Sequence, residues 1–150
     1  SAVALKERLN DDIKAAMRAK EKARLGLLRM LHSAIRNAEI DQGGELAEAE
    51  QYAVVNKLIK QRRDSAEQYR QGGRDDLADN EDSEADILAE YLPPALSDAE
   101  IDEAIDQAVG ETGATGPQDM GKVMGVLKER LQGRADMGEV SQRVKGRLAS

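Results

Sequence analysis

The sequence predicts an all-α protein, and three observations support this fold class. Apolar residues such as Leu5, Leu9 and Ile13 recur at helical spacing, and no segment alternates as a β-strand does. Hydrophobic residues make up 40% of the chain and charged residues 34%, as in soluble globular proteins. Phe and Trp are absent, so the core is expected to consist of aliphatic residues that mostly favour helix.

Four helices are expected in the first part of the chain. The first carries the apolar stripe from Leu5 to Met17, and the second carries Leu28, Leu31 and Ile35. Gly43-Gly44 should end the second helix, because glycine readily adopts the left-handed conformation after a helix. The third is expected from roughly Glu45 to Gln71. The fourth should begin near Asp75.

Pro93-Pro94 is the best candidate for a domain boundary. Proline lacks the backbone N–H of a helix and pushes the preceding residue out of the helical region. We therefore predict an N-terminal helical subdomain over residues 1–92 and a C-terminal three-helix subdomain over residues 95–150.

Cap signals define the three helices of the C-terminal part. Ser97 and Glu100 form the pattern of a capping box, which predicts the start of a helix there. A glycine-rich loop is expected from Gly110 to Gly116, followed by a helix with Pro117 at its first position. The last helix should begin at Asp136, which is a favourable N-cap residue.

The charges are unevenly distributed. Residues 75–121 contain Asp and Glu but no Lys or Arg, whereas residues 1–74 and 122–150 are net basic. Basic ends can attract phosphate, so this pattern is compatible with nucleic-acid binding. Solvated helix faces explain the same pattern equally well.

No catalytic motif is found in the sequence. There is no cysteine, and His32 is the only histidine, so we expect neither a metal site nor a cofactor. His32 is interpreted as an ordinary core or surface residue. The acidic run from Asp75 to Asp86 matches no calcium-binding loop and is interpreted as a solvated face. No apolar signal segment is seen near the N-terminus, which predicts a cytoplasmic protein.

Gly121 and Gly125 lie four residues apart within a predicted helix, at a cost of about 1 kcal/mol each relative to alanine. We favour close helix–helix packing as the reason. The alternative is that their backbone is exposed for contact with a ligand or with RNA.

Several motifs together resemble the GatB/YqeY family. They are Asp119-Met120-Gly121-Lys122-Val123-Met124-Gly125, Gly133-Arg134-Ala135-Asp136, Val140, Val144-Lys145, Arg29-Met30-Leu31, Lys60-Gln61-Arg62-Arg63-Asp64-Ser65, Arg74-Asp75-Asp76-Leu77-Ala78 and Glu90-Tyr91-Leu92-Pro93. The resemblance covers essentially the whole chain. It implies similarity to the C-terminal tail of the B subunit of glutamyl/aspartyl-tRNA amidotransferases, which helps to engage tRNA.

From this resemblance we predict an accessory tRNA-binding module without a catalytic site of its own. It would be linked only as a partner to carbon–nitrogen ligases that use glutamine as amide donor. The expected partners are tRNA and, as further candidates, amidotransferase or other translation-related proteins, with no membrane and no DNA. The residues expected to contact RNA are Lys122, Lys128, Arg130, Arg134, Arg143, Lys145 and Arg147. The alternative is a protein–protein adaptor that uses the acidic segment 75–106.

Overall fold

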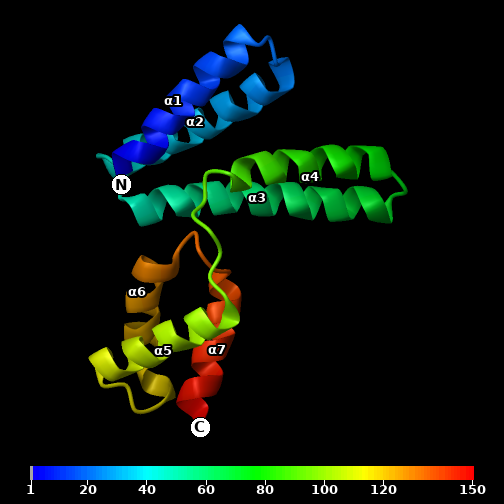
Figure 1. The fold of residues 1–150 in the computed structure, drawn as a ribbon. Helices are drawn as coiled ribbons and strands as arrows, with labels where there is room; N and C mark the ends of the chain where they lie inside the picture. The colour runs from blue at the N-terminus through cyan, green and yellow to red at the C-terminus, as the bar shows by residue number, and fades with distance from the viewer. Residues whose placement is uncertain (1) are drawn as a thin grey trace. The chain divides into compact units, whose positions relative to one another are not determined.

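The structure is a computed structural model that describes residues 2–150, so Ser1 of the predicted N-terminal subdomain lies outside the described residues. Its elements are α1 (Ala2–Arg18), α2 (Lys22–Gln42), α3 (Glu48–Gln71), α4 (Asp75–Ala89), α5 (Asp98–Thr112), the 3₁₀-helix η1 (Pro117–Asp119), α6 (Met120–Leu131) and α7 (Met137–Ala149). No β-strand is found among residues 2–150. The predicted all-α fold is confirmed (Figure 1).

The chain divides into two compact units, the first ending at Leu92 and the second beginning at Pro93. Helix α4 has already ended at Ala89, and the N–H groups of Tyr91 and Leu92 form the last turn-type hydrogen bonds before the prolines. Each unit has its own cluster of buried apolar side chains.

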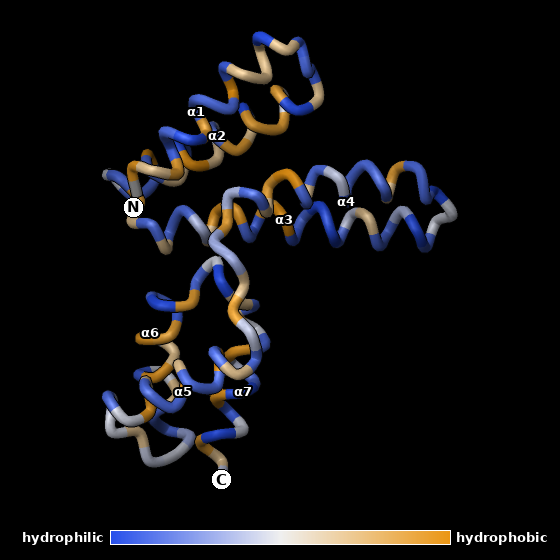
Figure 2. The backbone as a smooth tube through the Cα atoms, in the orientation of Figure 1, coloured by the Kyte–Doolittle hydropathy of each residue, from blue (hydrophilic) through white to orange (hydrophobic). Residues whose placement is uncertain are grey.

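Two helical hairpins, α1–α2 and α3–α4, form the N-terminal unit (Figure 1). Leu28 and Leu31 of α2, Val55 of α3 and Leu88 of α4 have no exposed surface, and Leu9 of α1 is nearly as buried. Figure 2 shows these hydrophobic stretches alternating along the helices with hydrophilic residues. The aliphatic core expected from the composition therefore joins all four helices.

Tyr91 attaches the end of this unit to α1. Its hydroxyl donates a hydrogen bond to the Asp12 carboxylate. The Arg8 guanidinium lies 4.7 Å from the centre of the Tyr91 ring, a cation–π distance. Arg8 also donates a 2.6 Å hydrogen bond to the Glu90 carbonyl.

The C-terminal unit packs α5, α6 and α7 around Ile105, Val123, Leu127, Val140 and Val144. These five residues are 3% exposed or less, which makes this a dry aliphatic core. It follows the apolar stripes that the helical spacing predicts.

The predicted caps at Ser97 and Asp136 are confirmed. The Ser97 hydroxyl accepts a hydrogen bond from the Glu100 N–H at 3.2 Å, and the Glu100 carboxylate accepts one from the Ser97 N–H at 3.0 Å. Asp136 caps α7 by accepting hydrogen bonds from the N–H groups of Gly138 and Glu139. Such reciprocal bonds satisfy backbone donors that a helix start leaves unpaired.

Three expected boundaries differ from the structure. Pro117 begins the 3₁₀-helix η1 and not α6, which starts at Met120. Helix α3 begins at Glu48 and not near Glu45, because the Leu46 side chain is buried and its N–H donates to the Glu39 carboxylate. Helix α5 continues past Gly110 to Thr112 and ends at Gly113, which has a left-handed φ of 67°. The loop after α5 is therefore shorter than predicted.

The packing explanation for Gly121 and Gly125 is wrong. Both glycines are exposed, and a Cβ built at either position meets no atom within 4 Å. Within the described chain, neither glycine is required for a close approach between helices.

Candidate functional site

The seven residues predicted to contact RNA lie on α6, on α7 and in the turn between them. Five of them have partners within the C-terminal unit. Arg130 pairs with Glu111 at 2.6 Å, Arg147 pairs with Asp106 at 3.2 Å, and Lys122 lies 4.0 Å from Asp119. Arg134 donates through Nε to the Pro94 carbonyl at 3.4 Å. The two lysines Lys128 and Lys145 are exposed, and neither has an ion pair among residues 2–150.

Arg143 is the most extensively paired of these cations. Its guanidinium lies 2.9 Å from Asp98 and 2.9 Å from Asp102 of α5, and 3.2 Å from Glu139 of α7. Hydrogen bonds to Asp102 and Glu139 raise the pKa of Arg143 above its usual value. The structure therefore uses Arg143 to join α5 to α7.

Replacing Arg143 with alanine should lower the melting temperature more than replacing the exposed Lys145 with alanine. The first change leaves Asp98, Asp102 and Glu139 close together without their cation, whereas the second breaks no ion pair. The difference should shrink at high salt, because ions screen exposed charges. Circular-dichroism melts at low and high salt test this, and equal melting temperatures at low salt would contradict it.

The acidic segment 75–106 is also used inside the protein. In the N-terminal unit, Arg63 of α3 pairs with Asp82 and Asp86 of α4, and Arg70 pairs with Asp79 and Asp82. In the C-terminal unit, acidic side chains of α5 pair with arginines of α7. Many of these carboxylates hold neighbouring helices together, which leaves fewer charges for an external partner.

A concentration of basic side chains lies in the α1–α2 hairpin, which the sequence interpretation missed, and of these only Arg24 has an ion pair among residues 2–150, with Glu90 at 3.5 Å. Between Asp12 and Glu39 the only acidic residue is Glu21. The basic residues of the same segment are Lys14, Arg18, Lys20, Lys22, Arg24, Arg29 and Arg36. Acidic residues elsewhere in residues 1–74 offset these cations in the net charge of that range. The net charge of a shorter range reveals the excess of basic residues.

Three of these cations form a line along the exposed side of α2. Lys22, Arg29 and Arg36 are spaced seven residues apart, so each lies about 10.5 Å from the next along one helix face. All three are exposed. Leu28 and Leu31 occupy the buried side of the same helix. The α2 helix thus separates a cationic face from an apolar one.

The turn between α1 and α2 adds further positive potential. Helix α2 begins with Lys22, has no acidic residue in its first turn and receives no side-chain cap from Glu21. A helix N-terminus carries a partial positive charge, so these cations add to it. Lys20 in the turn has a left-handed φ of 58°. On α1, Glu7 and Asp11 are exposed nearer the N-terminus, so the cationic area is confined to the turn end and α2.

Exposed apolar side chains accompany these cations. The large apolar residues Val3, Met17 and Ile40 are 57%, 51% and 65% exposed, and all three belong to α1 or α2. The Met17 sulfur lies 3.7 Å from the Arg29 guanidinium, so an apolar and a cationic side chain meet beside the turn. We call the exposed basic and apolar residues between Lys14 and Ile40 the hairpin face.

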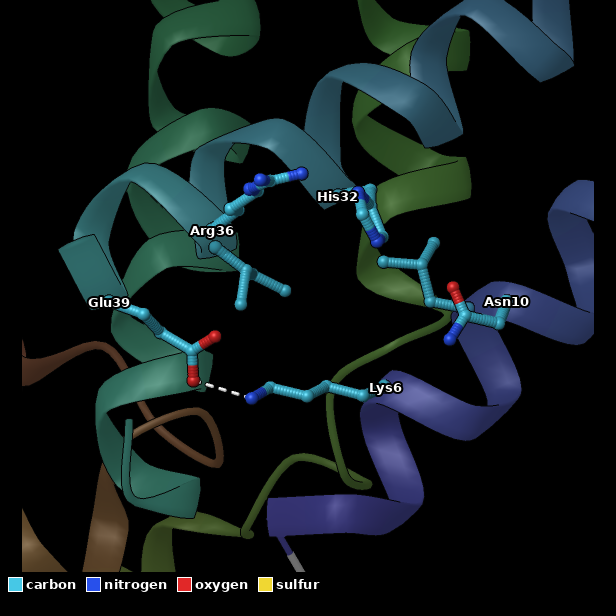
Figure 3. Close-up of a pocket in the computed structure, with 7 residues that line it drawn as sticks. Lys6, Asn10, His32, Arg36 and Glu39 are labelled. Carbon is cyan, nitrogen blue, oxygen red and sulfur yellow. Dashed lines mark hydrogen bonds and ion pairs between the residues drawn. The ribbon is translucent and has the colours of Figure 1, made fainter. Parts of the chain in front are cut away.

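A pocket of about 210 Å³ opens between α1 and α2 (Figure 3). The residues that line it are Lys6, Leu9, Asn10, His32, Ile35, Arg36 and Glu39. Lys6 reaches across from α1 to Glu39, with 2.5 Å between Nζ and Oε2 (Figure 3). Three polar groups of the pocket, Asn10, His32 and Arg36, have no hydrogen bond or ion pair among residues 2–150.

No group of three or more His, Cys, Asp or Glu side chains among residues 2–150 could hold a metal ion. Within the same residues, no helix is long and apolar enough to span a membrane.

The fold and the hairpin face define an all-helical protein with a hairpin whose exposed cations are mostly without an acidic partner among residues 2–150. Residues 6–148 match the family of Yqey-like proteins, and the chain belongs to this family. The family resemblance predicted from the sequence is therefore confirmed.

The chain is similar to proteins named "Altered inheritance of mitochondria protein 41, mitochondrial". It is 40% identical over 112 residues to the protein of Lachancea thermotolerans, a match covering 73% of this chain and 60% of that one. It is 41% identical over 110 residues to that of Clavispora lusitaniae, covering 72% and 64%. With that of Pyrenophora tritici-repentis the identity is 33% over 140 residues, covering 91% and 77%. The match thus spans less than two thirds of the first two relatives.

These relatives correct two predictions. The predicted function, an accessory tRNA-binding module or else an adaptor using segment 75–106, is wrong, because the relatives are named for the inheritance of mitochondria and not for tRNA. The predicted cytoplasmic location is also wrong, because the names of the relatives call them mitochondrial. The ion pairs of Arg143 and Arg147 give a physical reason for the first error.

Proposed function

We propose that this chain is a peripheral membrane-binding protein that attaches to an anionic phospholipid surface through its hairpin face. The observation that carries the proposal is the segment between Asp12 and Glu39, where many cations accompany a single carboxylate. Each Lys or Arg held near an anionic bilayer contributes about 1 kcal/mol to binding. Several such residues together are enough for reversible attachment.

The apolar side chains of the hairpin face favour a lipid surface. Met17 and Ile40 are more than half exposed on the two helices that carry the cations. Interfacial helices combine Lys and Arg with apolar residues that enter the boundary between headgroups and acyl chains. The hairpin contains no Phe, Tyr or Trp between Ala2 and Gln42, so it lacks the large aromatic side chains on which bases usually stack.

The net charge of −7 does not oppose this attachment strongly. Charges are screened over about 10 Å at 0.1 M ionic strength, so the nearby cations dominate the field at the contact. Several acidic side chains of α4 are already paired with arginines of α3. The local field of the hairpin face is therefore positive although the whole chain is acidic.

The proposed cellular location comes from the relatives, whose names refer to mitochondria. We carry this location over to the chain as part of the proposal, since mitochondria are bounded by membranes. It replaces the expectation that no membrane is contacted. The protein partners that the family resemblance implies, amidotransferase or other translation-related proteins, stay a prediction.

Cosedimentation with vesicles tests the proposal. The protein should bind vesicles of phosphatidylcholine mixed with phosphatidylglycerol and should not bind vesicles of phosphatidylcholine alone. Changing Lys14, Lys22 and Arg29 to Gln should weaken binding on the order of 100-fold, at about 1 kcal/mol per charge.

The matched control changes Lys57, Lys128 and Lys145 to Gln. This variant has the same net charge as the first, and its three lysines are also exposed. It should bind the anionic vesicles within about 3-fold of the original protein, because its substitutions lie outside the hairpin face. Equal weakening by both variants, or no binding by the original protein at moderate salt, would refute the proposal.

A further inference from the structure

The pocket between α1 and α2 has exposed donors without a partner among residues 2–150 on one side and a closed ion pair on the other. Lys6 and Glu39 pair with each other, and Glu39 also accepts the Leu46 N–H at 2.9 Å. These two donors lower the pKa of Glu39 below its usual value, so it remains a carboxylate. Its charge is offset within the protein and does not exclude an anion from the rest of the pocket.

The remaining polar groups are all able to donate hydrogen bonds. Arg36 and His32 come from successive turns of α2, and Asn10 comes from α1. Figure 3 shows the end of the Arg36 side chain directed toward His32, with Asn10 on the opposite helix. A guanidinium fork matches the oxygen atoms of a phosphate in geometry and charge. An imidazole N–H and an amide N–H can donate to further oxygens of the same group.

The volume of the pocket and the apolar residues at its base favour a ligand that is larger than a bare ion. Its volume of about 210 Å³ is several times the roughly 30 Å³ that a water molecule occupies in the liquid. Leu9 and Ile35 lie beneath it and are almost fully buried, so its base is apolar. A ligand that fits both features has an anionic head and a short carbon substituent.

We infer that this pocket binds a phosphate ester, with Arg36, His32 and Asn10 on the phosphate oxygens and Leu9 and Ile35 beneath the carbon substituent. The inference rests on the proposed function, since it names the chemical group that the hairpin recognises. A phospholipid headgroup and a free organic phosphate share this chemistry, and the experiment below separates them.

The soluble arm titrates glycerol 3-phosphate into the full chain and follows backbone and side-chain NMR signals. Shifts should concentrate at Asn10, His32 and Arg36. Changing Arg36 to Gln should weaken the affinity for glycerol 3-phosphate by about 10-fold or more, because a charge-assisted hydrogen bond is lost. Changing Arg29 to Gln removes a charge of the same helix face outside the pocket, and should weaken it by less than about 3-fold.

The lipid arm measures binding of the same variants to phosphatidylcholine vesicles containing phosphatidylglycerol. If Arg36→Gln lowers the affinity for these vesicles more than Arg29→Gln does, the pocket binds the phospholipid headgroup. Equal losses in this arm, with the soluble arm as expected, assign it to a free organic phosphate. Both results support a phosphate-ester pocket.

Two results separate the failure of this inference from failure of the proposed function. If Arg36→Gln and Arg29→Gln weaken glycerol 3-phosphate binding equally, or if the shifts fall elsewhere, the pocket inference is overturned even when the vesicles bind. If glycerol 3-phosphate binds at the pocket but the original protein does not bind anionic vesicles, the pocket inference is supported and the membrane proposal is refuted.

Discussion

Replacing Leu28 with alanine is expected to lower the free energy of unfolding by about 2–5 kcal/mol. Leu28 has no exposed surface and lies in the aliphatic cluster that joins α1, α2, α3 and α4. Shortening it removes buried methyl and methylene groups and leaves a cavity that the surrounding helices fill only in part. Urea unfolding followed by circular dichroism measures the change.

The matched control lies two residues away on the same helix. Gly26 is exposed, and a Cβ at this position meets no atom within 4 Å. Changing Gly26 to alanine should raise the free energy of unfolding by up to about 1 kcal/mol, because alanine is the better helix former. Two variants of one helix should therefore change stability in opposite directions. A Leu28→Ala variant as stable as the original would contradict the assignment of this core.

Local signals predicted the fold well. The capping box at Ser97 and the Asp136 cap each depend on side chains within three residues of the backbone groups that they bind. The start of α3 was misplaced because its cause is a contact with the preceding helix and not a local cap signal. Glu39 of α2 binds the Leu46 N–H and keeps the chain extended before the helix.

The site was harder to predict for a related reason. Arg143 and Asp102 are 41 residues apart, so spacing alone could not reveal that α5 neutralises the arginines of α7. The basic C-terminal residues were therefore predicted to be available for RNA, whereas most of them are paired within the unit. The hairpin face could have been predicted from the sequence, because Glu21 is the only acidic residue among the many cations between Asp12 and Glu39. The pocket could not have been predicted from the sequence, because His32 and Asn10 line one pocket only when α1 folds against α2.

Two tyrosines of the N-terminal unit should make its stability fall at alkaline pH. Burial and a 2.5 Å hydrogen bond to Glu48 raise the pKa of Tyr52 from 10.0 to about 12. Burial also raises the pKa of Tyr91, and its hydrogen bond to the Asp12 carboxylate adds to the effect. In both cases the folded protein favours the neutral phenol, since a phenolate would be desolvated beside a carboxylate.

The sign of the pH dependence follows from these raised pKa values. The unfolded chain ionises its tyrosines near pH 10, so the stabilisation is complete below that pH and declines as the pH rises toward 12. For Tyr52 alone the rise in pKa corresponds to about 2–3 kcal/mol.

Changing both Tyr52 and Tyr91 to phenylalanine removes the ionisable groups and should abolish this part of the decline. Urea unfolding from pH 8 upward compares the two proteins, with phenolate absorbance as a second readout. The original protein should lose at least about 2 kcal/mol more than the double variant above pH 10, and parallel curves would show that neither phenol is held neutral by the fold.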